Sequence, residues 1–444
     1  MTSPAPSTAS TAVHRLRAEA REAANRCIQC GYCLPVCPTY HSMGKETHSP
    51  RGRINLVKAA ADGKIDLLDD MAPSLDLCLG CRACETACPV GVPYGQILEA
   101  GRAATVRETA ARGRSAGRLQ TLALKHLFPH PGRLRAAGRL VEAAQRLRLD
   151  RLVFAFPPAR EAAPALTALG RIVPSVDGRF RLPPGTRLSA EGEKKRTVAF
   201  FQGCVMDAVM PRINWLTVEL LRKAGCEVVI PAGQTCCGAL HVHQGLPEAA
   251  AELVKRNLDA FEETGAEWIV NNAGGCGAML CECGHVLADA GGGWPERAAA
   301  FAARSRDISQ VLVETGLPPL VKRPEGLVTL QESCHLRNVQ KAAGAPEKLL
   351  RETAGDRFRA LSGASDCCAS GGIFNLLHFE ESMAILDAKM DSVRQTAAVT
   401  VVTSNPGCHL QMRLGIRRAG LEDRCRAVHL VEYLAECAGL TAER

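Results

Sequence analysis

The chain has few aromatic side chains and no long apolar run. Phe, Trp and Tyr together make up 4% of its 444 residues. This is too few for the aromatic platforms on which single-stranded nucleic acids stack, so we expect no nucleic acid partner. No stretch approaches the roughly 18 consecutive apolar residues of a membrane-spanning helix. Residues 1–20 contain no apolar signal core, so we expect a cytoplasmic protein.

Signatures of nucleotide binding and of acyl-transfer catalysis are absent as well. No G-x-G-x-x-G opens a helix after a strand, and the sequence has neither a P-loop nor a nucleophile elbow. Nothing else in it resembles a group that could take hydride from a hydroxy acid. We therefore expect no catalytic residue in this chain and expect substrate oxidation to take place on another subunit.

Cysteine, by contrast, is abundant, with 21 residues. Apolar residues make up 46% of the chain, so a core can form without covalent cross-links. In a cytosolic chain of this length, such a cysteine density indicates metal binding or redox chemistry rather than disulfides.

Positive charge is concentrated in one stretch. The formal net charge is +8, yet residues 101–160 alone have 13 Lys and Arg against three acids. This excess favours a local anionic partner, either a phospholipid surface in peripheral membrane contact or an acidic subunit. The alternative is a solvated helical face. The candidate contact residues are Arg133, Arg135, Arg139, Arg146 and Arg148.

Eight N-terminal cysteines form two runs of equal spacing. Each reads C-x2-C-x2-C-x3-C-P, the pattern of bacterial two-cluster ferredoxins. Three closely spaced thiolates can bind one cubane, and the fourth, which a proline turns away, binds the other. A closed tetrahedral zinc site fits this pattern poorly. We therefore predict two [4Fe-4S] clusters, the first bound by Cys27, Cys30, Cys33 and Cys88 and the second by Cys78, Cys81, Cys84 and Cys37.

The residues between the two runs have a helical pattern, notably residues 53–61. We expect a flexible tail over residues 1–15 and an α-helical ferredoxin domain over residues 16–100. Arg51 and Arg53 are placed to moderate the negative charge of the clusters. Two adjacent cubanes have no open position for substrate, so such a domain passes electrons one at a time between a donor and an acceptor.

The rest of the chain changes character twice. Residues 101–195 are predicted as a basic helical segment, broken at residues 128–132, followed by a Pro-rich linker. Short apolar runs then alternate with amphipathic segments, which indicates a parallel sheet covered by helices. The predicted strands are residues 197–201, 227–230, 268–270, 328–330 and 399–402, and the predicted helices of the first part are residues 212–224 and 247–263.

A second set of cysteines marks an internal duplication. A single cysteine, a Cys-Cys pair and another single cysteine occur twice, at a separation of 130 to 132 residues. We predict an α+β multidomain protein with one α/β cysteine-rich repeat over residues 196–325 and another over 326–444. Adjacent cysteines make poor disulfides but usable ligands for a further cluster or metal. The candidates are Cys204, Cys236, Cys237, Cys276, Cys334, Cys367, Cys368 and Cys408.

Other residues near these loops are weaker candidates. Histidines that flank them could ligate metal or move protons, although most loop histidines are merely solvated. These are His241, His243, His335 and His409. Cys281 and Cys283 are weak ligand candidates, and Cys226, Cys425 and Cys437 are expected to be packing residues.

The paired runs and the doubled cysteine-rich repeat resemble the iron–sulfur subunit of glycolate dehydrogenase, also called glycolate oxidase, over residues from about 20 to 440. Residues 49–54 (SPRGRI) and 37–40 (CPTY) are similar to that subunit in particular. The resemblance implies an FAD-containing partner that oxidises glycolate and this chain as the non-flavin, electron-transferring subunit. It further implies membrane quinone as the electron acceptor.

The repeats depart from the pattern of that family, in which the last cysteine belongs to a C-x-x-C pair. Ala273 and Asn405 occupy the positions of the missing cysteines, and Ala369 stands where the motif has Gly. Two alternatives stay open. One is a related subunit for lactate or glycerol 3-phosphate oxidation. The other is a thiol/disulfide enzyme similar to heterodisulfide reductases, which the missing cysteines disfavour. If the repeats hold no metal, their thiols are buried packing residues.

Overall fold

The computed structural model describes all of the chain except residues 1–10, 115–116, 156–157, 159–160, 162 and 441–444. Its residues form two compact units. The first unit comprises residues up to 122 together with 240–249, and the second comprises residues 123–239 and those from 250 onward. Each unit is described by itself.

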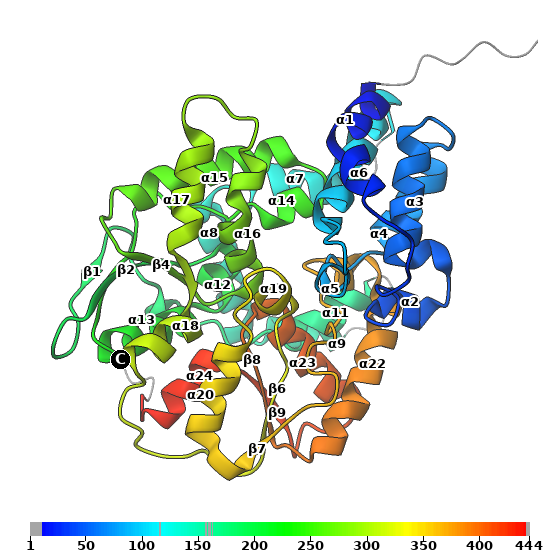
Figure 1. Ribbon diagram of the computed structural model, residues 1–444. Helices are drawn as coiled ribbons and strands as arrows, with labels where there is room; N and C mark the ends of the chain where they lie inside the picture. Colours follow the sequence, from blue (N-terminus) through cyan, green and yellow to red (C-terminus); the bar gives the residue numbers. More distant parts are fainter. Residues whose placement is uncertain (1–10, 115–116, 156–157, 159–160, 162, 441–444) are drawn as a thin grey trace, which may run out of the picture. The chain divides into compact units, whose positions relative to one another are not determined.

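Three long helices, α1 (Thr11–Asn25), α3 (Pro50–Ala61) and α6 (Tyr94–Ala111), form the core of the first unit (Figure 1). Leu16, Ala20 and Ala24 lie on one face of α1 and are fully buried, so their small size lets the helices approach closely. The loops between these helices contain the shorter elements α2 (Pro38–Met43), η1 (Glu46–His48), η2 (Leu67–Met71), α4 (Ala72–Asp76) and α5 (Ala83–Thr86).

The predicted helix over residues 53–61 is confirmed as part of α3. Its start has a local cause, because the Ser49 hydroxyl accepts a hydrogen bond from the Gly52 amide and Pro50 occupies the first turn. Residues 1–10 of the expected tail lie outside the described residues. Residues 11–15 form the first turn and a half of α1 rather than a tail.

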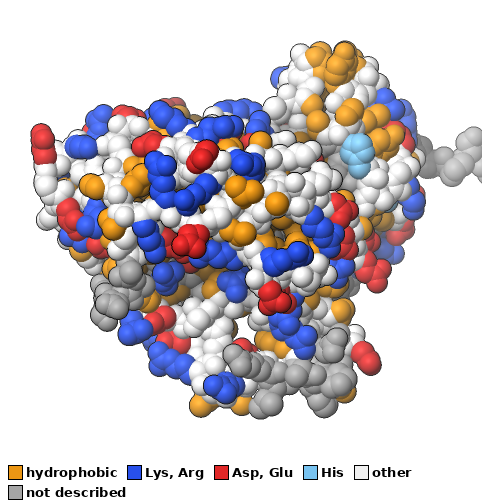
Figure 2. All heavy atoms as spheres, turned by 90° about the horizontal axis from the view of Figure 1, so that it is seen from below, with side chains coloured by type: hydrophobic (Ala, Val, Ile, Leu, Met, Phe, Trp, Pro, Cys, Tyr) orange, Lys and Arg blue, Asp and Glu red, His pale blue; other side chains and the backbone are white. Residues whose placement is uncertain are grey.

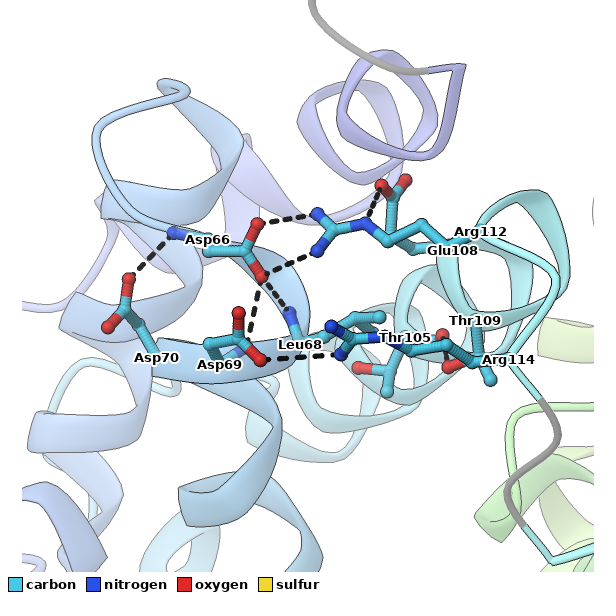
Figure 3. A network of polar contacts seen from close by, with 9 residues as sticks. All are labelled: Asp66, Leu68, Asp69, Asp70, Thr105, Glu108, Thr109, Arg112 and Arg114. Atoms are coloured by element: carbon cyan, nitrogen blue, oxygen red, sulfur yellow. Dashed lines mark hydrogen bonds and ion pairs between the residues drawn. The ribbon is translucent and has the colours of Figure 1, made fainter.

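An ion-pair network fastens the end of α6 to the π-helical turn η2 (Figure 3). The Asp66 carboxylate caps that turn by accepting from the amides of Leu68 and Asp69. It also accepts from the Arg112 guanidinium, which bonds Glu108 as well. The Arg112 hydrogen bond, helped by these amides, lowers the pKa of Asp66 to about 2. The network thereby joins the C-terminal end of α6 to η2 within the first unit.

The second unit contains two sheets with the same strand order. In the first, β2 (Arg196–Phe201) lies between β3 (Cys226–Val229) and β4 (Trp268–Asn271), and β5 (Ser305–Asp307) follows β4. These four strands are parallel, and β1 (Arg187–Leu188) adds an antiparallel edge. The second sheet is parallel throughout, in the order β7 (Phe358–Arg359), β6 (Val328–Leu330), β8 (Thr400–Thr403) and β9 (Arg426–His429).

Helices follow the strands in both repeats, as βαβ connections require. In the first repeat they are α12 (Cys204–Val209), α13 (Pro211–Lys223), α14 (Ala239–His243), α15 (Pro247–Glu262), α16 (Gly274–Val286), α17 (Trp294–Arg304) and α18 (Ile308–Thr315). In the second they are α19 (Cys334–Asn338), α20 (Gly344–Ala354), α21 (Phe374–Leu377), α22 (Phe379–Thr396), α23 (Pro406–Arg418) and α24 (Leu430–Cys437).

The two repeats share one hydrophobic core. Phe200 of β2 and Leu216 of α13 belong to the same buried cluster as Val402 of β8 and Tyr433 of α24. Helices α13 and α24 pack against each other across the repeats. The predicted parallel α/β organisation is confirmed, and the predicted strands lie within one residue of the observed ones.

The stretch interpreted as a linker is more structured than expected. Residues 155–195 include α11 (Pro164–Gly170), the 3-10 turn η3 (Gly178–Phe180) and β1. Phe180 is buried, and its ring lies 5.3 Å from that of Trp215 in a tilted arrangement. Much of this segment is therefore part of the second unit rather than a spacer.

The basic segment contains α7 (Arg118–His126), α8 (Pro131–Arg146) and α9 (Leu149–Ala155). The predicted break falls between α7 and α8. Helix α8 packs closely on α12, because a Cβ at Gly138 would lie 2.2 Å from the Ala208 carbonyl oxygen. None of the helices in the described part of the chain is long and apolar enough to cross a membrane.

One expectation for this segment was wrong. Arg135 is not available to an external anion, because it forms an ion pair with the buried Asp207 of α12. Glu142, also buried, forms ion pairs with Arg146 and Arg181. On the face that Figure 2 shows, Lys and Arg side chains lie beside Asp and Glu side chains rather than in one unbroken patch.

Candidate metal centres

The eight N-terminal cysteines gather around two pockets of the first unit. One pocket is lined by Cys27, Cys30, Cys33 and Cys88, the predicted ligands of the first cluster. Cys84 lines the same pocket. The second pocket is lined by Cys37, Cys78, Cys81 and Cys84, the predicted ligands of the second cluster. Each pocket thus contains three thiols of one run and at least one thiol of the other, and Cys84 lines both pockets.

The two runs share one backbone conformation. Residues at the third and fifth positions have positive φ in both, with φ of 61° at Gln29 and 88° at Gly31 in the first run. The second run has 63° at Gly80 and 60° at Arg82. These left-handed residues curl each loop so that its thiols face inward. The repeated strain at Gln29 and Arg82 indicates a conformation selected for its side-chain directions.

The second site has a strongly polar, buried surrounding. The Tyr94 hydroxyl and the Gly80 amide both donate to the Cys78 sulfur, at 3.4 and 3.5 Å. Arg53 is only 1% exposed and lies near both Cys78 and Cys37. Burial alone would raise the pKa of Cys78, but the charges of Arg53 and Arg102 and the Tyr94 hydroxyl bring it below its ordinary value.

The first site lies closer to solvent. Cys30 is exposed, and the neighbouring Ile28 and Tyr32 are 64% and 67% exposed. The Cys27 sulfur accepts from the Gln29 amide group at 3.3 Å, and the Cys88 sulfur accepts from a backbone amide at 3.4 Å. The two sites thus differ in charge and in access to water.

Burial changes the pKa of three further thiols of these sites. Burial raises the pKa of Cys33 and of Cys37, and it raises that of Cys84 well above the ordinary value. Within the described residues, no group of three or more His, Cys, Asp or Glu side chains is arranged for a single metal ion. A cubane distributes its four thiolates over four irons, and two pockets lined by at least four thiols each have the donor set for that group.

In the first repeat, four thiols meet at the ends of the strands. Cys204 begins α12, Cys236 and Cys237 follow β3, and Cys276 lies in the first turn of α16. Cys204 contacts Cys236, and Cys237 contacts both Cys236 and Cys276. These contacts, together with burial, raise the pKa of Cys204 and of Cys237 well above the ordinary value.

The second repeat has four thiols at the corresponding positions. Cys334 begins α19, Cys367 and Cys368 lie in the loop after β7, and Cys408 lies in the first turn of α23. Cys368 contacts Cys367 and Cys408. All 21 cysteines lie in the described part of the chain, and no disulfide joins any of them.

The position that lacks a cysteine in the second repeat has a bridging role. The Asn405 amide nitrogen donates to the Cys408 sulfur at 3.5 Å, and its oxygen accepts from the Gly275 amide of the first repeat at 3.1 Å. Asn405 therefore joins the thiol loops of both repeats. Ala273, at the equivalent position of the first repeat, is buried and offers no polar group.

The flanking histidines differ in their surroundings. His409 is 2% exposed, and its ring lies 3.2 Å from the Ala427 carbonyl. Burial lowers its pKa. His241 is fully buried, and His243 lies 3.4 Å from Glu99 within the first unit. The expected packing roles fit Cys226, Cys425 and Cys437, which are all buried. Cys283 of α16 donates to the Ala298 carbonyl of α17.

Of the polar groups that surround the second site, sequence reasoning named Arg53 but missed Tyr94. Tyr94 gives no sequence signal, because the motif contains only cysteines and prolines. Arg53 does give one, since it falls on the same face of α3 as Val57 and Ala60, a spacing that predicts burial. Lys389 was also missed; it is 5% exposed near the thiols of the second repeat, where burial lowers its pKa.

Three families match successive parts of the chain. Residues 23–92 match the 4Fe-4S dicluster domain, and residues 198–281 and 328–413 each match the cysteine-rich domain. Residues 115–172 match the linker region of the glycolate oxidase iron–sulfur subunit.

Whole-chain relatives agree with these matches. The chain is 45% identical to a probable glycolate oxidase iron–sulfur subunit of Bacillus subtilis (strain 168), over 93% of this chain and 94% of the relative. It is 30% identical to the glycolate oxidase iron–sulfur subunit of Escherichia coli (strain K12), over 89% and 91%. A lactate utilization protein A of Oceanobacillus iheyensis is 34% identical over 53% of this chain and 96% of the relative.

An iron–sulfur module followed by a duplicated cysteine-rich domain defines a class of electron-transfer subunits of oxidoreductase complexes. Within that class, the chain belongs to the glycolate oxidase iron–sulfur subunit family. The resemblance stated from the sequence is thereby confirmed.

Proposed function

We propose that this chain is the electron-transfer subunit of a glycolate-oxidising complex and binds two [4Fe-4S] clusters at its N-terminal cysteines. Cys27, Cys30, Cys33 and Cys88 hold the first cluster, and Cys78, Cys81, Cys84 and Cys37 hold the second. The observation that supports this most is the pair of pockets, each lined by a complete set of four thiols drawn from both runs.

The clusters supply one-electron transfer when bound. The chain's own residues hold them and hydrogen-bond their sulfurs. An FAD-containing partner oxidises glycolate and delivers electrons to this subunit, and membrane quinone receives them. The proposal draws its partner from the family to which the chain belongs.

The test of this division of labour is a reconstitution. The purified chain should oxidise no glycolate with an artificial acceptor, whereas the chain with its flavoprotein partner should do so. Cys81→Ser should stop electron delivery to quinone while flavin reduction by glycolate continues in the partner. Glycolate oxidation by the lone chain would refute the proposal.

The same proposal includes peripheral contact with the inner membrane surface through α8. Arg139, Leu140 and Leu147 lie on its exposed side, and the two leucines are 73% and 68% exposed. They lie seven residues apart and so on the same face of the helix. Exposed leucine beside arginine suits the headgroup region of an anionic bilayer.

Vesicle flotation tests this contact. Leu140→Gln with Leu147→Gln should weaken binding to anionic vesicles at least tenfold, and Arg139→Glu should weaken it in a salt-dependent way. Val321→Gln and Arg424→Glu are matched controls, since both side chains are exposed elsewhere in the second unit. Unchanged vesicle binding with loss of the flavoprotein partner would identify the surface as a subunit interface instead.

The repeats could hold a further cluster or metal at Cys204, Cys236, Cys237, Cys276, Cys334, Cys367, Cys368 and Cys408. The thiol contacts in the first repeat support this proposal, and they equally suit the alternative of a thiol/disulfide enzyme. Turnover of a disulfide by the lone chain would favour the alternative. Iron that persists when all eight N-terminal ligands are replaced by serine would favour the metal site.

A further inference from the structure

The two N-terminal sites differ in one buried charge. Arg53 is 1% exposed, and within the described residues its hydrogen bonds go to uncharged oxygens. These are the carbonyls of Ser74 and Leu77, at 2.7 and 3.0 Å, and the Thr39 hydroxyl at 3.1 Å. Thr39 in turn lies 3.3 Å from the Cys37 sulfur. A full positive charge is thus buried beside the second site without a carboxylate.

The corresponding charge near the first site is neutralised. Arg51 donates to Glu46 at 2.7 Å and remains partly exposed. It lines the first pocket, and its guanidinium donates to the Gln29 carbonyl at 3.3 Å. The other basic groups near the second site are Arg82, which is paired with Glu85, and Arg102, which donates to the Cys78 carbonyl at 2.8 Å.

We propose that Arg53, assisted by the Tyr94 hydroxyl, holds the second cluster at a higher reduction potential than the first, so that an electron shared between them resides on the second. This inference rests on the proposed two-cluster assignment and assigns an order to its two sites.

The physical reason is electrostatic. Reduction adds one negative charge to a cluster, and a buried cation stabilises that charge more than an exposed ion pair does. Hydrogen bonds to the ligand sulfurs raise the reduction potential of a cluster as well. Solvent exposure of the cluster is a separate influence on that potential. The Cys78 sulfur accepts from Tyr94 and Gly80, and Tyr94 is itself only 4% exposed.

A redox titration of the full chain, followed by electron paramagnetic resonance, tests the inference without glycolate or partner. Cys30→Ser and Cys81→Ser assign the signals, because each disturbs one site. In the wild-type chain the second cluster should be reduced first, by a preference of at least tenfold, which corresponds to about 59 mV for a one-electron couple.

Removing the charge of Arg53 should abolish the preferential reduction of the second cluster. Arg53→Gln should reduce the population of reduced second cluster at least tenfold relative to the first, whereas Arg53→Lys should stay close to wild type. Arg51→Gln is the matched control at the first site and should leave the second cluster unchanged. An Arg53→Gln chain in which both clusters shift equally, or neither shifts, would overturn the inference.

Arg53→Gln could prevent loading of the second cluster, which an iron count would reveal. Tyr94→Phe then decides, because it removes one donor to the Cys78 sulfur and keeps the ring. It should disfavour the reduced second cluster by twofold or more; an unchanged potential would overturn the inference. A wild-type chain with fewer than two clusters would instead refute the cofactor assignment, which separates the two failures.

Discussion

The cysteines of the first unit lie on loops, whereas those of the repeats lie near the ends of strands. The N-terminal thiols line two pockets on loops of the first unit, where Cys78 belongs to the helical core and Cys27, Cys84 and Cys88 pack against that core. The thiols of the repeats lie beside a core that joins both sheets. In the first repeat Cys236 contacts Cys204 and Cys237, and Cys204 and Cys236 line a pocket of the second unit. We expect from this comparison that bound clusters add to the stability of the first unit, whereas the packing of their shared core stabilises the repeats.

Loss of a predicted cluster ligand should have the largest effect. Cys81→Ser should remove roughly half of the iron of a two-cluster chain and unfold the loops of the first unit, because cluster binding energy is folding energy there. Cys204→Ser should leave the N-terminal iron intact and change stability little. Iron analysis and limited proteolysis of the two variants measure this. Equal iron loss in both would remove the distinction.

A core truncation in the repeats should show the opposite pattern. Phe200 is fully buried in the core shared by both sheets, so Phe200→Ala should lower the free energy of unfolding by about 3 to 5 kcal/mol. The three tryptophans, Trp215, Trp268 and Trp294, all lie in the second unit. Their fluorescence in a denaturant titration follows this loss, while visible absorption follows the clusters, which should stay unaffected until the second unit unfolds.

A buried histidine should make the repeats sensitive to acid. His429 accepts from the Val431 amide at 3.2 Å and contacts the Asn272 carbonyl at 2.9 Å, so its neutral form is fully bonded. Burial, with His409 acting in the same direction, lowers its pKa from 6.5 to about 3. The unfolded chain therefore binds a proton that the folded chain excludes, and the stability due to His429 is lost as pH falls below about 6.5.

His429→Asn isolates this effect from other groups. The difference in unfolding free energy between wild type and variant should change by about 2 kcal/mol in the variant's favour between pH 7 and pH 5. The comparison is needed because burial raises the pKa of Asp307 to about 6, which has the opposite pH dependence. Parallel stability curves would show that His429 accepts a proton in the folded chain.

The smallest effect should come from the surface network of the first unit. Asp66→Asn keeps the cap of η2 but removes the ion pair with Arg112 (Figure 3). Because the pair is about one third exposed, the loss should be about 0.5 to 1 kcal/mol and should fall with added salt. The contribution exists above pH 3.8 and disappears as pH falls through about 2. Melting of the cluster-bound chain in low and high salt measures it.

Much of this fold could be predicted from the sequence because its signals are local. The period of the apolar runs placed the strands of both sheets, and the spacing of the cysteines placed four thiols around each N-terminal pocket. The ordered part of residues 155–195 could not be foreseen, since β1 exists only through its pairing with β3. A two-residue edge strand has no pattern of its own.

The groups that distinguish the two sites depend on tertiary contacts. Arg53 and Arg135 are both arginines in helices. The spacing on α3 predicts that Arg53 is buried, but only the fold shows that it lies near Cys78 and that Arg135 is paired with Asp207. Asn405 could be noticed as a replaced cysteine, but its link to Gly275 depends on how the two repeats pack. The sequence alone therefore could not predict which groups these polar side chains contact in the folded chain.

The most direct test of the account is a count of iron and acid-labile sulfide in the anaerobically purified wild-type chain. Two N-terminal cubanes predict at least about eight irons and eight sulfides per chain, with two interacting paramagnetic centres after reduction. Near-stoichiometric zinc with little iron, or a single cluster bound to one run of cysteines, would contradict the account.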